Sequence, residues 1–417
     1  MRIILLNAEY FVKGGVARYL FNIKNLLESK GHTVIPFSVQ HNENEKTEWS
    51  KYFLSPIGKG SEVHFKDFGI KSKFKYFSRM FYSFEAKRKL EKLILDTKPD
   101  IIYALQYHKY ISCSVISVAK KHKIPFVHRI SDFGAICPNY YLYSFKTHSL
   151  CEKCVKGSFV NAIKNRCGRN IFAKTLMCSF YKFYGVAKKT DAFVFTCEHT
   201  KQKFIEAGYQ KEKCFTIPTF FNKNLITITE PVSYEPFALF IGRLDREKGV
   251  EVLIDAFLRN QKPLKIIGLQ GSDKNYNKLL NEKLRNAEHK IELLGQMNFE
   301  QIQTYLSKCL FTICPANWYE NLPNAVLESY AFKKCVVATN IGSLKDAVKE
   351  NETGLLFERC DAKDLANKAE YLFENKSEAV RMGENAGLEI ENVYCAEGHY
   401  GRLMGVFKGV MAEAGRC

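Results

Sequence analysis

Twelve short apolar segments rich in Val, Ile and Phe recur along the 417-residue chain, and segments with helical periodicity lie between them. Near-continuous apolar strands that alternate with helices are typical of parallel sheets covered on both faces. Six segments precede residue 220 and six follow residue 235, which predicts two α/β domains. The segments are 2–7, 33–38, 101–105, 125–131, 191–196, 214–219, 236–242, 263–268, 291–295, 311–316, 335–340 and 354–357.

The boundary between the two sets is polar. The stretch 222–236 carries two prolines, so we place a linker at 222–235, between an N-terminal domain (1–221) and a C-terminal domain (236–395). Residues 396–417 form a helical tail, for which we consider packing back on the first domain. Ligands of parallel sheets bind beyond the carboxyl ends of the strands. Two Rossmann-like domains therefore predict a central cleft that both sheets face.

The net charge of +18 is confined to one half of the chain. Residues 1–220 hold 37 Lys and Arg against 17 Asp and Glu, whereas 221–417 hold 25 against 27. Residues 71–93 are the most basic stretch, with eight Lys and Arg against two Glu, interleaved with aromatic residues. Such a helix can lie on an anionic membrane, stack on single-stranded nucleic acid, or remain a solvated helix packed on the sheet.

Cysteine usage predicts reduced thiols and one special cluster. The 14 cysteines are scattered, mostly in apolar segments, as expected in a reducing compartment. Four of them, Cys137, Cys151, Cys154 and Cys167, fall within 31 residues, and Cys151 and Cys154 have the spacing of a zinc knuckle. This insert, 137–167, predicts a structural zinc site. The alternative is a set of buried or redox-labile thiols in a loop that shapes one side of the cleft.

Two loops that follow predicted strands carry groups suited to phosphate. Gly14 and Gly15 open the first helix, where backbone N–H groups can approach an anion closely. Arg243 and Lys248 follow the first strand of the second domain and can neutralise a diphosphate. The alternative for the Gly14–Gly15 loop is a tight turn without a ligand, and the alternative for the loop with Arg243 and Lys248 is a solvated charged turn.

A pair of glutamates follows the strand 311–316. Glu320 lies in a loop, and Glu328 falls a turn or two into the next helix. Carboxylates accept hydrogen bonds from vicinal hydroxyls, so the pair can hold a sugar and a ribose. Two exposed glutamates on an amphipathic helix are the alternative.

Together the Gly14–Gly15 loop, the segment GRLDREKG, the two glutamates and TNIGSLKDAVKENETGLLF resemble the family 4 retaining glycosyltransferases of the GT-B fold. This resemblance implies that Arg243 and Lys248 bind the donor diphosphate and, with Glu320, form the catalytic set. It further implies that Glu320 contacts the donor sugar and Glu328 the ribose. The remaining donor-site residues implied are Gly14, Gly15, Asn321 and Leu322.

The chain departs from this family pattern at several positions. Ser131 precedes Asp132 where many relatives have histidine, so we take His128 and Asp132 as acceptor-side candidates. Ser343 and Lys333 occupy positions where glycine is common.

The resemblance implies an enzyme of bacterial envelope polysaccharide synthesis. It would transfer sugar from a UDP- or GDP-sugar to a lipid-linked or polysaccharide acceptor, with no cofactor required for catalysis. We expect a cytoplasmic protein, peripheral on the inner face of the membrane through 71–93, with no nucleic-acid partner. The alternatives are a nucleic-acid-binding protein that uses the basic half, and a nucleotide-sugar epimerase or hydrolase of the same fold.

Overall fold

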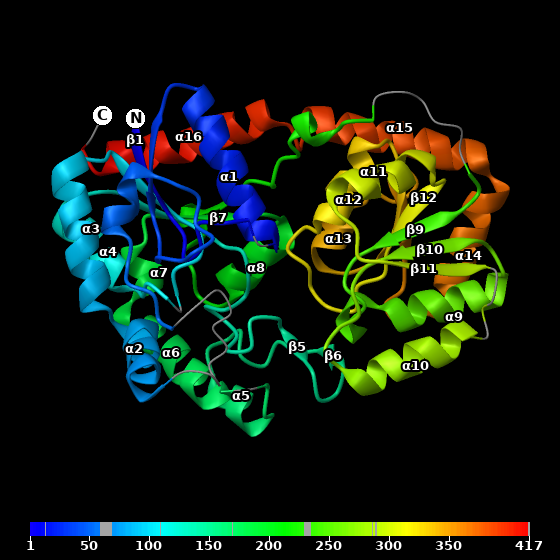
Figure 1. The fold of residues 1–417 in the computed structure, drawn as a ribbon, viewed down its shortest axis with the longest axis horizontal. Coiled ribbons are helices and arrows are strands. Elements are labelled where there is room, and N and C mark those ends of the chain that lie inside the picture. The colour runs from blue at the N-terminus through cyan, green and yellow to red at the C-terminus, as the bar shows by residue number, and fades with distance from the viewer. Residues whose placement is uncertain are drawn as a thin grey trace.

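The computed structural model describes the chain except residues 13, 59–68, 109, 169, 229–234, 286, 288, 289, 416 and 417. Two α/β domains lie side by side (Figure 1). Each contains a six-stranded parallel sheet, in the order β2-β1-β3-β4-β7-β8 and β11-β10-β9-β12-β13-β14. Each of these strands lies in a predicted apolar segment, so the predicted fold class is confirmed.

The N-terminal sheet places helices on both faces. Its strands are β1 (Arg2–Leu6), β2 (Thr33–Phe37), β3 (Ile101–Ala104), β4 (Phe126–Arg129), β7 (Ala192–Phe195) and β8 (Cys214–Thr216). The helices of this domain are α1 (Gly14–Ser29), α2 (Ile70–Phe81), α3 (Phe84–Thr97), α4 (Ser114–Lys121), α5 (Val160–Lys164), α6 (Ile171–Tyr184), α7 (Val186–Lys189) and α8 (Glu198–Glu206). A small hairpin of β5 (Tyr143–Ser144) and β6 (Ser149–Leu150) lies in the cysteine-rich insert.

The C-terminal domain repeats this plan. Its strands are β9 (Ala238–Ile241), β10 (Leu264–Ile267), β11 (Ile291–Gly295), β12 (Phe311–Cys314), β13 (Val336–Thr339) and β14 (Gly354–Phe357). The helices are α9 (Val250–Asn260), α10 (Lys274–Arg285), α11 (Phe299–Lys308), α12 (Asn324–Ala331), α13 (Gly342–Ala347), α14 (Ala362–Glu374) and α15 (Lys376–Asn392), and the tail that follows forms α16 (Ala396–Glu413). Short 3-10 helices occur in both domains and between them: η1 (Glu48–Tyr52) and η3 (Lys211–Lys213) in the N-terminal domain, η4 (Lys223–Leu225) in the linker and η5 (Arg246–Lys248) in the C-terminal domain.

The apolar periodicity explains how α9 packs. Val250, Leu253, Ile254 and Phe257 form one buried face against the second sheet. Gly249 precedes the helix with φ +74°, and a Cβ there would lie 1.7 Å from the carbonyl oxygen of Pro315. Only glycine fits this turn, which brings the end of β9 close to the end of β12.

The connection between the domains contacts both of them. The predicted linker 222–235 is described except for 229–234, and its first part contains η4. The Nε2 of Gln303 in α11 donates to the carbonyl of Leu225 at 2.9 Å. No helix in the described part of the chain has the length and apolarity needed to cross a bilayer.

Helix α16 returns to the N-terminal domain after α15 (Figure 1). Leu403 and Phe407 pack in one cluster with Leu20 and Tyr103. His399 is fully buried, and its Nδ1 donates to the carbonyl of Pro218 at 2.8 Å. Because a carbonyl only accepts, Nε2 is left to accept from the hydroxyl of Tyr19, 2.9 Å away. The tail thereby joins α1 to the segment that leaves the first domain.

We predict that His399 makes the fold acid-sensitive. Burial lowers its pKa to about 3, so the native state excludes a proton that the unfolded chain binds below about pH 6.5. Its contribution is present above that pH and is lost as the pH falls, by about 2 kcal/mol at pH 5. His399→Asn keeps a donor for Pro218 and should flatten the dependence of the melting temperature on pH. An unchanged slope in this variant would exclude His399 as the source.

Candidate functional site

The two domains meet where α1 faces α12. A Cβ at Gly15 would lie 3.3 Å from Nδ2 of Asn324, so the two helices approach each other closely here. One turn further along α1, the guanidinium of Arg18 forms an ion pair with Glu328 of α12, at 2.8 Å. These residues line a cavity of about 30 Å³ between the domains. Gly15 and Glu328 are thus brought to one place, although 313 positions separate them.

Glu328 is a buried carboxylate. Its side chain is 8% exposed, and burial raises its pKa while the charge of Arg18 opposes that shift. A carboxylate in such a site needs a cation or hydroxyl donors to offset its lost hydration. Arg18 fills that need here, and it is a residue that the sequence analysis missed.

Lys248 and Glu320 form a second ion pair, at the carboxyl ends of β9 and β12. The Nζ of Lys248 lies 2.5 Å from Oε1 of Glu320, and the indole N–H of Trp318 donates to the same oxygen at 2.6 Å. Burial opposes the charge of Lys248, but the adjacent carboxylate prevails and raises its pKa. Lys248 therefore stays a cation at neutral pH.

Arg243 follows β9 and is more open to solvent. It pairs with Asp245 at 2.8 Å and is 61% exposed. Its charge also acts on Lys248, whose protonation it disfavours. Two cations predicted to bind phosphate therefore lie close to each other, Lys248 22% exposed and Arg243 61% exposed.

Asn321 binds the loop that carries Glu320 to the N-terminal domain. The side-chain amide of Asn321 donates to the carbonyl of Ser131 at 2.7 Å, and its oxygen accepts from Thr200 at 2.7 Å. The hydroxyl of Thr196 donates to the backbone carbonyl of Asn321. The predicted donor-site residue Asn321 is thus engaged with the opposite domain through its side chain.

The cysteine-rich insert also reaches this loop. The ring of Tyr141 stacks on Trp318, with centroids 4.8 Å apart and planes 19° from parallel. Glu152 accepts from the hydroxyl of Tyr319 at 2.8 Å and from Lys203 at 2.9 Å. Although burial opposes it, these two donors hold the pKa of Glu152 below its usual value. The insert therefore crosses from the first domain to the donor-side loop, which the sequence did not indicate.

Leu322 closes the loop in a strained conformation. Its φ is +83°, in the left-handed region that leucine rarely adopts. The backbone N–H of Leu322 donates to the hydroxyl of Ser343 at 3.1 Å, which fixes this turn. Ser343 thus has a structural use at a position where relatives commonly have glycine. Strain of this kind persists only where surrounding contacts impose it, and it often marks functional sites.

The acceptor-side candidates differ in exposure. His128 is 3% exposed and packs among Tyr107, His108 and Phe193. Its Nε2 lies 3.2 Å from the carbonyl of Leu105, and burial lowers its pKa well below the ordinary value. This packing withdraws His128 from the cleft, whereas Asp132 is half-buried beside the loop that ends at Gly134. The acceptor role of Asp132 stays a prediction.

The four cysteines of the insert are neighbours but not a formed metal centre. Burial and the nearby thiols of Cys137, Cys151 and Cys167 raise the pKa of Cys154 to about 12. Each described cysteine is a free thiol. Among the described residues, no three His, Cys, Asp or Glu side chains gather closely enough to hold a metal ion. The structure thus shows no assembled zinc centre in its described part, and we derive no step through a metal.

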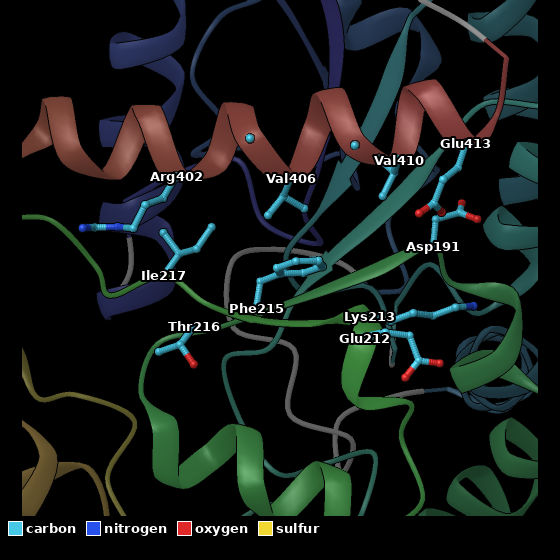
Figure 2. Close-up of a pocket in the computed structure, with 12 residues that line it drawn as sticks. Asp191, Glu212, Lys213, Phe215, Thr216, Ile217, Arg402, Val406, Val410 and Glu413 are labelled. Carbon is cyan, nitrogen blue, oxygen red and sulfur yellow. The ribbon is translucent and has the colours of Figure 1, made fainter.

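A larger cavity of about 460 Å³ lies away from these residues, between β8 and α16 (Figure 2). Phe215, Ile217, Val406 and Val410 point into it. Charged side chains also line it (Asp191, Glu212, Lys213, Arg402 and Glu413), but among the described residues none of these cations pairs with one of these carboxylates, in contrast to the interdomain face. We therefore place the candidate site between the domains.

Zinc in the insert stays a prediction that metal analysis can decide. If the loops close around zinc, purified protein prepared without chelator should contain about one equivalent, and Cys154→Ser should release it. Cys113→Ser, at a buried cysteine outside the insert, is the matched control. Protein free of metal would leave the insert as an assembly of thiols.

Comparisons with known proteins agree with this geometry. Residues 223–388 match the model of the glycosyl transferases group 1, and residues 13–153 match that of glycosyltransferase family 4. An uncharacterised 42.6 kDa protein in the cps region of Klebsiella pneumoniae is 27% identical over 357 residues, 83% of this chain and 87% of the relative.

Two further matches carry names that bear on the chemistry. An α-1,4-N-acetyl-D-galactosaminyltransferase of Campylobacter jejuni, named for a diphospho-undecaprenol-linked glycan, is 25% identical over 186 residues, covering 44% of this chain and 51% of that one. The structure of HepE from Anabaena with UDP-glucose aligns over all of both chains with a TM-score of 0.61 and 14% identity, a likeness of fold alone. The two family models, the paired domains and these relatives together show that the chain belongs to the family 4 glycosyltransferases of the GT-B fold.

Proposed function

We propose that the chain is a retaining glycosyltransferase that moves a sugar from a UDP- or GDP-sugar to a lipid-linked glycan of the bacterial envelope. The observation that carries this proposal is the pair of ion pairs, Arg18–Glu328 and Lys248–Glu320, at the interdomain face. Each pair joins a cation to a carboxylate. A nucleotide-sugar carries phosphate groups that could bind the cation and hydroxyls that could bind the carboxylate. Ribose hydroxyls would donate to Glu328, and the diphosphate would accept from Lys248 and Arg243.

The reaction needs no protein base in this scheme. The bond between the anomeric carbon and the diphosphate breaks, and the acceptor oxygen bonds to the same face of that carbon. The acceptor proton passes to an oxygen of the leaving diphosphate. Lys248 and Arg243 stabilise the charge that develops on the diphosphate, and Glu320 orients the sugar.

The names of relatives support the choice of substrates. HepE has been solved with UDP-glucose, and the Campylobacter relative is named for an undecaprenol-linked glycan. The Klebsiella relative is encoded in a cps region. We therefore propose envelope polysaccharide synthesis, with the protein at the inner face of the cytoplasmic membrane. A screen of nucleotide-sugars with membrane extract, scoring labelled lipid-linked product, tests this function. Nucleotide release without any glycosylated product would instead indicate a hydrolase.

We predict that Lys248→Ala and Arg243→Ala each lower transfer at least about tenfold, because each removes a cation from the developing diphosphate. Glu320→Ala should also impair transfer. Lys278→Ala, an exposed lysine of α10, is the matched control. Steady-state rates within twofold of wild type in the Lys248 variant would remove it from the site.

We predict opposite effects from the two members of the Arg18–Glu328 pair. Glu328→Ala removes the ribose acceptor and should weaken UDP or GDP binding at least about tenfold. Arg18→Ala frees the carboxylate and should leave that affinity equal or higher. Calorimetric titration with the nucleoside diphosphate measures both. Equal losses in the two variants would show that the pair only holds the domains together.

A further inference from the structure

Two helices of the N-terminal domain expose large apolar side chains in stripes. In α2, Ile70, Phe74 and Phe77 recur at helical spacing, and Ile70 and Phe74 are 88% and 77% exposed. In α6, Phe172, Leu176 and Phe183 recur in the same way, and Phe183 is 90% exposed. Burial of a large apolar side chain lowers the free energy, so a group of such side chains left exposed to water indicates a binding surface.

The two helices lie together. The rings of Phe81 in α2 and Phe180 in α6 meet edge to face at 5.7 Å. Figure 1 shows α2, α6 and α5 side by side on the N-terminal domain, and α5 adds the exposed side chains of Val160 and Ile163. The three helices therefore offer one apolar face, which we call the α2–α5–α6 face.

The charge around this face has one sign. Residues 70–84 contain four Lys and Arg, residues 153–190 contain nine, and neither stretch contains Asp or Glu. Lys71, Lys164, Arg166 and Lys182 are exposed. A partner must therefore offer both hydrocarbon and negative charge, a combination typical of an anionic lipid bilayer.

Not every basic residue of the predicted membrane segment 71–93 reaches the surface. Arg79 is 1% exposed and pairs with Glu85 at 2.6 Å. Lys75 donates to the hydroxyl of Ser55 and to the carbonyl of Pro56. Their charges organise the fold, which corrects the view that the whole of 71–93 is available to a partner.

We propose that the α2–α5–α6 face docks on an anionic lipid bilayer. This inference rests on the proposed function, because a lipid-linked acceptor would be presented at that surface. The chain runs from Tyr141 and Glu152, which contact the donor-side loop, directly into α5. Docking would therefore place the bilayer and the cleft at opposite ends of one continuous insert.

Vesicle binding tests the proposal. Phe74→Ser combined with Phe183→Ser should weaken sedimentation with vesicles of phosphatidylglycerol and phosphatidylcholine at least about tenfold. Leu269→Ser with Leu388→Ser, two exposed leucines of the C-terminal domain, should leave it unchanged. Lys164→Glu with Lys182→Glu should weaken binding and reduce its salt dependence. Binding of the nucleoside diphosphate should persist in each variant, so a docking defect is distinguishable from a wrong function.

A depth-sensitive readout separates insertion from a structural effect. A Trp introduced as Phe183→Trp should be quenched by brominated lipids, whereas Leu388→Trp should not. Equal binding to purely zwitterionic vesicles, or equal quenching at both positions, would overturn the proposal. So would dimerisation without vesicles that the two serine changes abolish, or RNA binding that survives them.

Discussion

An ion pair between Arg18 and Glu328 joins the two domains at the point where α1 faces α12. Burial of the Glu328 carboxylate is costly unless a donor compensates it. Arg18 is only partly buried, so it can leave that carboxylate to a ligand. Arg18 opposes the rise in pKa that burial imposes on Glu328, and Gly15 approaches Asn324 closely beside the same ion pair. We infer that a nucleotide would exchange its ribose hydroxyls for Arg18.

The loop that carries Glu320 depends on both domains. Asn321 is bonded to Ser131 and Thr200, and Tyr319 to Glu152, while Lys248 holds Glu320 itself. In this arrangement Leu322 adopts a strained left-handed backbone conformation. The contacts between the domains therefore set the position of the carboxylate that we propose orients the sugar. Because oriented groups contribute much of an enzyme's rate enhancement, small changes at the interdomain face should affect catalysis.

The sequence predicted the sheets well and the contacts between domains poorly. A buried strand is encoded by consecutive apolar residues, so the segments that form β1 and β9 were recognisable in the sequence. Lys248 and Glu320 were found because they lie in motifs that resemble a family. Arg18 and Tyr141 were missed because their partners stand far away in the sequence. The apolar periodicity of α6 was equally ambiguous, since a buried stripe and an exposed stripe have the same spacing.

The most direct test is a crystal structure with a bound nucleoside diphosphate. The account predicts that Glu328 accepts from a ribose hydroxyl, that Arg18 has left it, and that the diphosphate lies on Lys248 and Arg243. A nucleotide bound in the cavity between β8 and α16, with the Arg18–Glu328 pair intact, would contradict it.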